Sequence, residues 1–207
     1  MIDNYIKLDN GIIKQIETKP FIYDSSYSKY YDKIKVSSLQ MSNLRLGYLL
    51  GCLGKVPSSL LDIGYGNGDF LNVASHIIPN CYGYDVSDYL SLNTIKRIDS
   101  LYDKEFDVVC MFDVLEHFDD IYTIKKIKTN YFIISIPECH YFSDEWFTSW
   151  KHRKPDEHIW HFNAKSLINF MNEIEFEVVC FSNIEDVIRK SNDNHSNIMT
   201  GIFRKIN

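Results

Sequence analysis

The sequence predicts an α/β domain in which a mostly parallel β-sheet is buried between two layers of helices. After Pro57, short apolar runs alternate with helical segments, and this alternation is typical of right-handed β-α-β units. Runs that are apolar on both faces suit strands covered on both sides. The length of 207 residues fits one domain, and an apolar fraction of 45% with a charged fraction of 24% is typical of a globular protein with a core.

The first two thirds of the sequence contain an N-terminal segment followed by the first strands and helices of the expected sheet. Residues 1–57 are expected to form an N-terminal helical or irregular segment. Within it a helix is expected over 42–53, because four leucines recur on one helical face, at positions 46, 49, 50 and 53. A helix is also expected over 69–78. We expect strands at 59–63, 81–86, 106–112 and 131–136.

The last third of the chain has a different order of elements. A helix is expected over 164–172, with Asn163 as its N-cap. Two strands follow, near 176–182 and 197–204, without a long helix between them. This order predicts an antiparallel pair at one edge of the sheet.

Charge and composition exclude several classes of protein. Acidic residues outnumber basic ones 28 to 22, which gives a net charge of −6 and argues against a nucleic-acid partner. The longest apolar runs fall far short of the ~20 residues that a membrane-spanning helix needs. The start of the chain has no apolar signal-peptide core, and the five cysteines form no C-x-x-C pair. We therefore expect a cytoplasmic protein with free thiols.

A glycine-rich loop carries the strongest functional signal. The strand that ends at Ile63 runs into Gly64, Gly66 and Gly68, and a helix follows. Glycines at such a turn allow positive φ angles and let a ligand lie against bare backbone. A dinucleotide fold would place a third glycine where this chain has Asp69, an acid that would repel a pyrophosphate. The loop therefore favours a ligand without phosphates.

Three further motifs follow the loop in order. Asp85 ends the next strand, where a carboxylate can accept hydrogen bonds from both ribose hydroxyls. The stretch Phe-Asp-Val-Val-Cys-Met-Phe-Asp-Val-Leu-Glu-His occupies 106–117, and Pro-Asp-Glu-His-Ile-Trp-His-Phe-Asn-Ala-Lys-Ser-Leu occupies 155–167. Together with the glycine loop, these motifs resemble the class I S-adenosylmethionine-dependent methyltransferases, and in particular their small-molecule, type 11/23-like members.

The resemblance implies a fold and a cofactor. The fold is Rossmann-like, with a seven-stranded, mostly parallel sheet of order 3-2-1-4-5-7-6, an antiparallel strand 7 and helices on both faces. Residues 58–207 would form the S-adenosylmethionine-binding domain and residues 1–57 a lid. Only 22 positions separate Asp85 from Asp107, so the second helix is expected to be short and the third strand, near 94–98, marginal. The cofactor-binding residues implied are Asp62, Gly64, Tyr65, Gly66, Gly68, Asp85, Asp99 and Asp113.

Some of these residues have a simpler alternative role. Asp62 could orient the glycine loop by accepting backbone N–H groups, and Asp85 could cap the short helix that follows it. Asp113 could contact the cofactor or cap a helix expected over 119–128.

Candidates for the acceptor side are histidines and tryptophans. His117, after the fourth strand, is our first choice of general base, and His140, after the fifth, is the second. Trp146, His158 and His161 are candidate substrate contacts in a loop at the carboxyl edge of the sheet. Arg45 could meet a substrate carboxylate, and tyrosines at 23, 27, 30 and 31 could close over the cofactor. No metal is expected, because a set of Glu157, His158 and His161 matches no recognised zinc spacing.

The predicted function is methyl transfer from S-adenosylmethionine to a small-molecule acceptor, most simply at oxygen or nitrogen. The Asp/Asn/Ser-Pro-Pro-aromatic motif of nucleic-acid amino-methylating enzymes is absent, and so is a Pro-Cys nucleophile. Two alternatives remain at this point: a non-catalytic binding module with the same fold, and a nucleotide-dependent oxidoreductase, which Asp69 disfavours.

Overall fold

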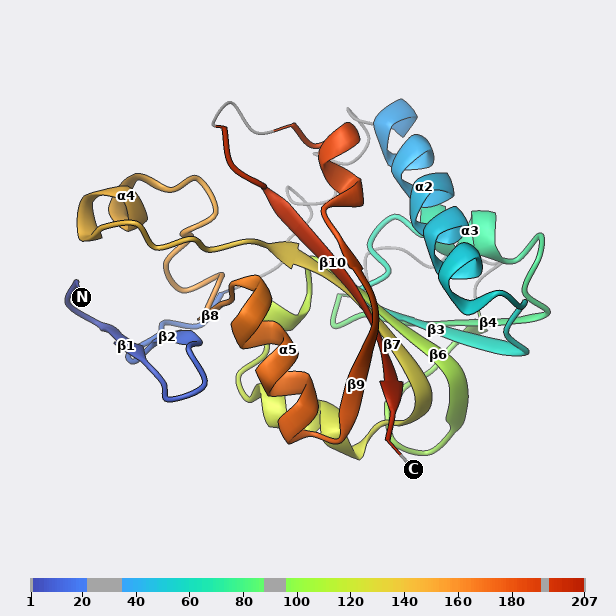
Figure 1. The fold of residues 1–207 in the computed structure, drawn as a ribbon. Coiled ribbons are helices and arrows are strands. Elements are labelled where there is room, and N and C mark those ends of the chain that lie inside the picture. Colours follow the sequence, from blue (N-terminus) through green and yellow to red (C-terminus); the bar gives the residue numbers. More distant parts are fainter. Residues whose placement is uncertain (1, 22–34, 88–95, 191–193, 207) are drawn as a thin grey trace.

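A seven-stranded sheet forms the centre of the computed structural model, which describes residues 2–21, 35–87, 96–190 and 194–206 (Figure 1). The strand order is β5-β4-β3-β6-β7-β10-β9. Strand β10 runs opposite to the other six strands, so the order and direction inferred from the resemblance are confirmed. The bounds are β3 (Ser59–Ile63), β4 (Asn80–Tyr84), β5 (Lys96–Arg97), β6 (Glu105–Phe112), β7 (Lys128–Pro137), β9 (Phe176–Ser182) and β10 (Ile198–Lys205).

Helices cover both faces of this sheet because the strands are apolar on both sides. Helices α2 (Lys35–Leu53) and α3 (Asp69–Ala74) pack on one face, against Leu60, Val108 and Ile133. On the other face, α5 (Ala164–Glu173) and the 3-10 helix η2 (Ile121–Lys126) pack against strand side chains that include Leu61, Val109 and Ile134. Figure 1 shows α2 and α3 on the side of the sheet opposite α5.

A second, three-stranded sheet of order β1-β2-β8 lies beside the main one. Strands β1 (Tyr5–Lys7) and β2 (Ile13–Gln15) pair antiparallel, and β8 (Trp160–His161) pairs with β2. The expectation that residues 1–57 are helical or irregular is therefore wrong for this hairpin. In β2 the side chains of Ile13 and Gln15 are buried. The strand pairs with β8, which is distant in sequence.

Most of the expected elements are present, with shifted ends. Strands β3 and β9 have the predicted bounds, and α5 carries the predicted Asn163 cap, completed as a capping box by Ser166. Helix α2 begins before the predicted start at 42, and α3 ends at Ala74, earlier than predicted, because a turn follows. The helix expected over 119–128 is the 3-10 helix η2, and its N-cap is Asp120 rather than Asp113. The short helix expected after Asp85 concerns residues 88–95, which lie outside the described residues.

The cysteines are free thiols, as expected: Cys52, Cys81, Cys110, Cys139 and Cys180 form no disulfide. Among the described helices, none combines the length and the apolar composition that crossing a bilayer would require.

Candidate functional site

A cavity of about 720 Å³ opens at the carboxyl ends of β3 and β6. That is the edge at which parallel α/β sheets bind ligands, and the volume lies in the range of ligand sites, about 300–1,000 Å³. One side is formed by the glycine loop and α2. The other side is formed by the segment 151–158, by His117 at the end of the 3-10 helix η1 (Leu115–His117), and by residues 188–190.

The glycine loop is held in a left-handed conformation. The φ angles of Gly64, Gly66 and Gly68 are 69°, 52° and 76°, a region that side chains with a Cβ rarely adopt. At Gly64 a Cβ would lie 2.4 Å from a methyl group of Val114, so glycine is also required by space. The Gly64 amide donates to the Tyr84 carbonyl at 2.7 Å, which ties the loop to β4. Gly64, Tyr65 and Gly66 line the cavity, as predicted.

Asp85 lies directly against this loop. The Gly66 amide donates to Asp85 Oδ2 at 3.1 Å, so the two motifs that the sequence separates by 19 positions are in contact. The other oxygen, Oδ1, accepts from the amide and hydroxyl of Ser87 at 2.9 and 2.6 Å, which closes a local Asx turn. The helix that Asp85 was expected to cap lies outside the described residues, so both the cap and the ribose contact stay predictions.

Asp62 presents a buried carboxyl group at the floor of the cavity. It is 3% exposed and lines the cavity at the end of β3. Burial raises its pKa to about 8; Arg45 opposes this shift and Asp85 adds to it. Within the described residues no loop amide donates to Asp62, so the expectation that it orients the glycine loop by such bonds receives no support. Its contact with the cofactor stays a prediction.

A four-residue ion-pair network joins three elements at the back of the cavity. The Arg45 side chain, from α2, donates to both oxygens of Glu185 at 2.7 and 3.0 Å. Arg189 donates to both oxygens of Asp113 at 2.7 and 2.9 Å and to Glu185 at 3.1 Å. Arg45 also lies 3.6 Å from Asp113, which completes the ring. Burial raises the pKa of Asp113, but Arg189 more than offsets it and holds that pKa below its usual range.

This network bears on two expectations. Asp113 lines the cavity but does not cap the helix after β6, and both its oxygens accept hydrogen bonds from Arg189. Its contact with the cofactor stays a prediction. Arg45 holds a carboxylate of the protein rather than one of a substrate, and its guanidinium lies 4.2 Å from the centre of the Phe112 ring. Glu185 and Arg189 were missed by the sequence analysis. Their i,i+4 spacing in a charged segment is the signal that could have drawn attention to them.

His117 and His158 form a pair on the acceptor side of the cavity. Both line it, and their rings cross at 82° with centres 4.6 Å apart. His117 Nδ1 lies 2.8 Å from the Glu157 carbonyl oxygen, and since a carbonyl only accepts, Nδ1 carries the proton. Burial lowers the pKa of both rings, that of His158 to about 2, so both are neutral at physiological pH.

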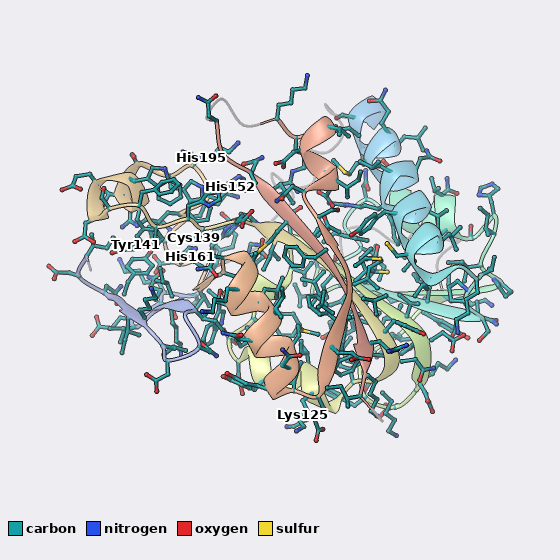
Figure 2. The ribbon with its side chains drawn as sticks, in the orientation of Figure 1. Lys125, Cys139, Tyr141, His152, His161 and His195 are labelled. Atoms are coloured by element: carbon teal, nitrogen blue, oxygen red, sulfur yellow. The ribbon has the colours of Figure 1, made fainter. Side chains whose placement is uncertain are left out.

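The remaining predicted site residues do not line this cavity. His140 stacks on Phe142 and contacts the Ser196 carbonyl at 2.8 Å. Trp146 stacks on Trp150, and His161 packs between Phe147 and Trp150 in an aromatic cluster beside α4 (Asp144–Ser149). Figure 2 shows His161 in that part of the molecule, near Cys139 and Tyr141.

Two other predictions concern residues away from the cavity or outside the described part. Asp99 is exposed and is absent from the described lining, so its adenine contact stays a prediction. The four N-terminal tyrosines, at 23, 27, 30 and 31, lie outside the described residues.

Comparison with known proteins places this site in a family. No curated protein matches the sequence. Among solved structures, the 1,6-didemethyltoxoflavin-N1-methyltransferase from Burkholderia thailandensis, solved with its substrate and S-adenosylhomocysteine, is 14% identical, with a TM-score of 0.60 over 99% of this chain and 100% of that one. The plantazolicin methyltransferase BpumL, solved with a desmethyl analogue and S-adenosylhomocysteine, is 14% identical, with a TM-score of 0.58 over 87% and 90%.

A methyltransferase from Archaeoglobus fulgidus is 20% identical, with a TM-score of 0.58 over 88% of this chain and 100% of that one. At these identities the structural matches establish the fold. The sequence itself matches the family described as a methyltransferase domain over residues 42–180, which is more than half of the chain. The chain therefore belongs to this methyltransferase family, and its resemblance to the class I S-adenosylmethionine-dependent methyltransferases is confirmed.

Proposed function

We propose that this chain transfers the methyl group of S-adenosylmethionine to an oxygen or nitrogen atom of a small-molecule acceptor that enters the same cavity. The observation that carries the proposal is the glycine loop, whose bare backbone and neighbouring carboxyl groups form one side of a cavity with neutral histidines opposite.

The cofactor side suits a cationic nucleoside without phosphates. Asp62 faces the cavity, and Asp69 stands at the start of α3, its carboxylate accepting from the Asn67 side-chain amide at 2.8 Å. The Asp69 carboxylate would repel a pyrophosphate, and a cationic group of S-adenosylmethionine beside Asp62 would favour the ionised form of its carboxyl group. We assign the ribose hydroxyls to Asp85, whose carboxylate accepts from the Gly66 amide.

The acceptor side supplies alignment and a proton acceptor. In the transfer, the bond between sulfur and the methyl carbon breaks while the acceptor atom forms its bond to the same carbon. The electron pair stays on sulfur, which becomes a neutral thioether, and the acceptor gives up its proton. Holding the two reactants in line can contribute about 7–11 kcal/mol, more than a general base usually does. His117, neutral and on the cavity wall, is the residue placed to take the proton.

The similar solved structures support a small acceptor. One of them was solved with bound 1,6-didemethyltoxoflavin and another with a plantazolicin analogue, each with S-adenosylhomocysteine. The net charge of −6 agrees with an acceptor other than nucleic acid.

Calorimetric titration of the chain with S-adenosylmethionine, S-adenosylhomocysteine and NAD tests the cofactor assignment. We expect both sulfur nucleosides to bind and NAD not to bind. Absence of binding by either nucleoside would overturn the proposal, and binding of NAD alone would support the oxidoreductase alternative. Release of S-adenosylhomocysteine during incubation with a panel of small acceptors then separates an enzyme from a non-catalytic binding module.

A further inference from the structure

We propose that Glu116, His117 and His158 form a binding site for one divalent transition-metal ion, of the Zn²⁺ or Mn²⁺ type, on the acceptor side of the cavity. The sequence analysis expected no metal, and the proposal rests on how the fold brings these three side chains together.

Backbone hydrogen bonds fix the two segments that carry these residues. The Ile159 amide donates to the Glu116 carbonyl at 2.9 Å, and His117 Nδ1 donates to the Glu157 carbonyl at 2.8 Å. These two bonds hold residues 157–159 against η1 across about forty positions of sequence. His158 is thereby placed beside His117 without depending on a flexible loop.

The donor atoms are close enough to share one ion. One ligand atom from each of the three side chains lies within 4.8 Å of the others. In a tetrahedral site the ligand atoms lie about 3.4 Å apart, since each lies about 2.0–2.2 Å from the metal. The widest pair therefore closes by up to about 1.4 Å when the ion binds, through rotation of the three side chains.

The carboxyl group of Glu116 is buried and has no hydrogen-bond partner among the described residues. The residue is 2% exposed, and the hydrogen bond is missing at both carboxylate oxygens. A buried polar group left in this state destabilises the fold, whereas a bound cation would satisfy both oxygens. The neighbouring Asp113 cannot serve instead, because both its oxygens already accept from Arg189.

The hydrogen bond from His117 Nδ1 to the Glu157 carbonyl is of the kind that orients metal-binding histidines. Histidines that bind metals usually donate their other ring N–H to a carbonyl or carboxylate, which fixes the tautomer and directs the second nitrogen to the ion. The bond from Nδ1 to the Glu157 carbonyl does this and assigns the lone pair to Nε2. Two histidines and one carboxylate are also a recognised set of ligands for catalytic zinc.

An ion at this site would be reachable from the cavity. His117 and His158 line the cavity, and so does Glu157, whose Oε1 lies 4.0 Å from His158 Nε2. Glu157 is a candidate fourth ligand, at the cost of its 3.0 Å pair with Lys154. Resting on the proposed function, the open position would hold an acceptor oxygen and favour its ionised form. With the ion bound, His117 would be a ligand and the ion would replace it in activating the acceptor; His117 would take the proton only in the metal-free enzyme.

The test measures metal binding directly. Protein stripped with a chelator is titrated with Zn²⁺ and with Mn²⁺ by calorimetry, and loading with Co²⁺ is followed by its visible absorption, which reports nitrogen and oxygen coordination. We expect one ion per chain. No saturable binding by any of the three ions would overturn the proposal.

Variants locate the site. Glu116→Gln keeps the volume and removes the charge, and His158→Ala removes one nitrogen; each is expected to weaken binding at least tenfold. His76→Ala is the matched control, because His76 is exposed just after α3 and is absent from the described lining of the cavity, so its removal should leave binding unchanged. Thermal melting of the metal-free proteins checks that the variants fold. Equal affinity in Glu116→Gln and His76→Ala would also overturn the proposal.

Failure here can be told from failure of the proposed function. Calorimetry of the metal-free wild type with S-adenosylmethionine reports the cofactor side alone, which shares no residue with the metal ligands. Binding of the nucleoside without binding of metal would refute the metal site and leave the methyltransferase assignment intact.

Discussion

The two sides of the cavity are built in different ways. The cofactor side consists of residues 62–68 with Asp85, a strand, a turn and the end of the next strand. The acceptor side is assembled from η1, the segment 151–158 and residues 188–190, which follow η3 (Ile184–Val187); these pieces are far apart in sequence. One side is a local motif and the other is a product of tertiary packing.

The two regions also differ in whether their buried charged groups have partners within the protein. On the cofactor side, the buried carboxyl group of Asp62 lines the cavity, where a cationic ligand could pair with it. At the back of the cavity, the charges of Arg45, Asp113, Glu185 and Arg189 largely satisfy one another. We therefore expect substitutions in the network to change stability and substitutions on the cofactor side to change ligand affinity.

The largest effect on stability is expected for Glu185→Ala. Glu185 has a fully buried side chain that accepts from two arginines, and its removal leaves Arg45 and Arg189 short of a partner. Breaking a buried ion pair in this way costs about 3–5 kcal/mol. Urea unfolding followed by circular dichroism should show a loss of this size.

Glu177→Ala is the matched control for that measurement. Glu177 pairs with Arg204, but the two side chains are 47% and 56% exposed. Exposed pairs of this kind contribute about 0–1 kcal/mol. A loss from Glu185→Ala as small as that from Glu177→Ala would show that the network does not hold α2 and η3 together.

The fold and the cofactor side could be predicted because their signals are local. The glycines at 64, 66 and 68 are needed where the chain turns with positive φ. Strands that are apolar on both faces can be recognised from their own residues. The pairing of β2 with β8 could not be predicted, since neither short strand shows which partner it takes. The same holds for the acceptor side. Nothing near Glu116 in the sequence indicates that His158 lies beside it, or that Arg189 donates hydrogen bonds to Asp113.

A second prediction concerns pH and Asp62. Its folded-state pKa, about 8, is raised above the ordinary value of 3.8 by burial, with Arg45 opposing and Asp85 adding to the shift. The folded state therefore holds a proton that the unfolded state releases. The stability from this proton is fully present below about pH 4 and is lost at about 1.4 kcal/mol per pH unit as pH rises toward 8.

Comparing wild type with Asp62→Asn isolates this contribution. The uncharged amide has no proton to lose, so the stability of Asp62→Asn relative to wild type should rise steadily between pH 5 and pH 8. The nearby thiols of Cys81 and Cys110 are common to both proteins, and burial raises the pKa of each, so they stay neutral over this range. Parallel stability curves would show that Asp62 is ionised in the folded protein.

The smallest expected effect, and the most specific, is on cofactor affinity. Asp85→Ala removes the carboxylate assigned to the ribose, and losing charge-assisted hydrogen bonds should weaken S-adenosylmethionine binding roughly tenfold or more. Asp103→Ala, at an exposed position between β5 and β6, is the control and should bind normally. Because Asp85 also holds the Gly66 amide and the Ser87 turn, Asp85→Asn is measured beside it. The amide can still accept from Gly66 or Ser87, so a normal affinity in Asp85→Asn would assign the residue to loop geometry, whereas losses in both variants would assign its charge to the cofactor.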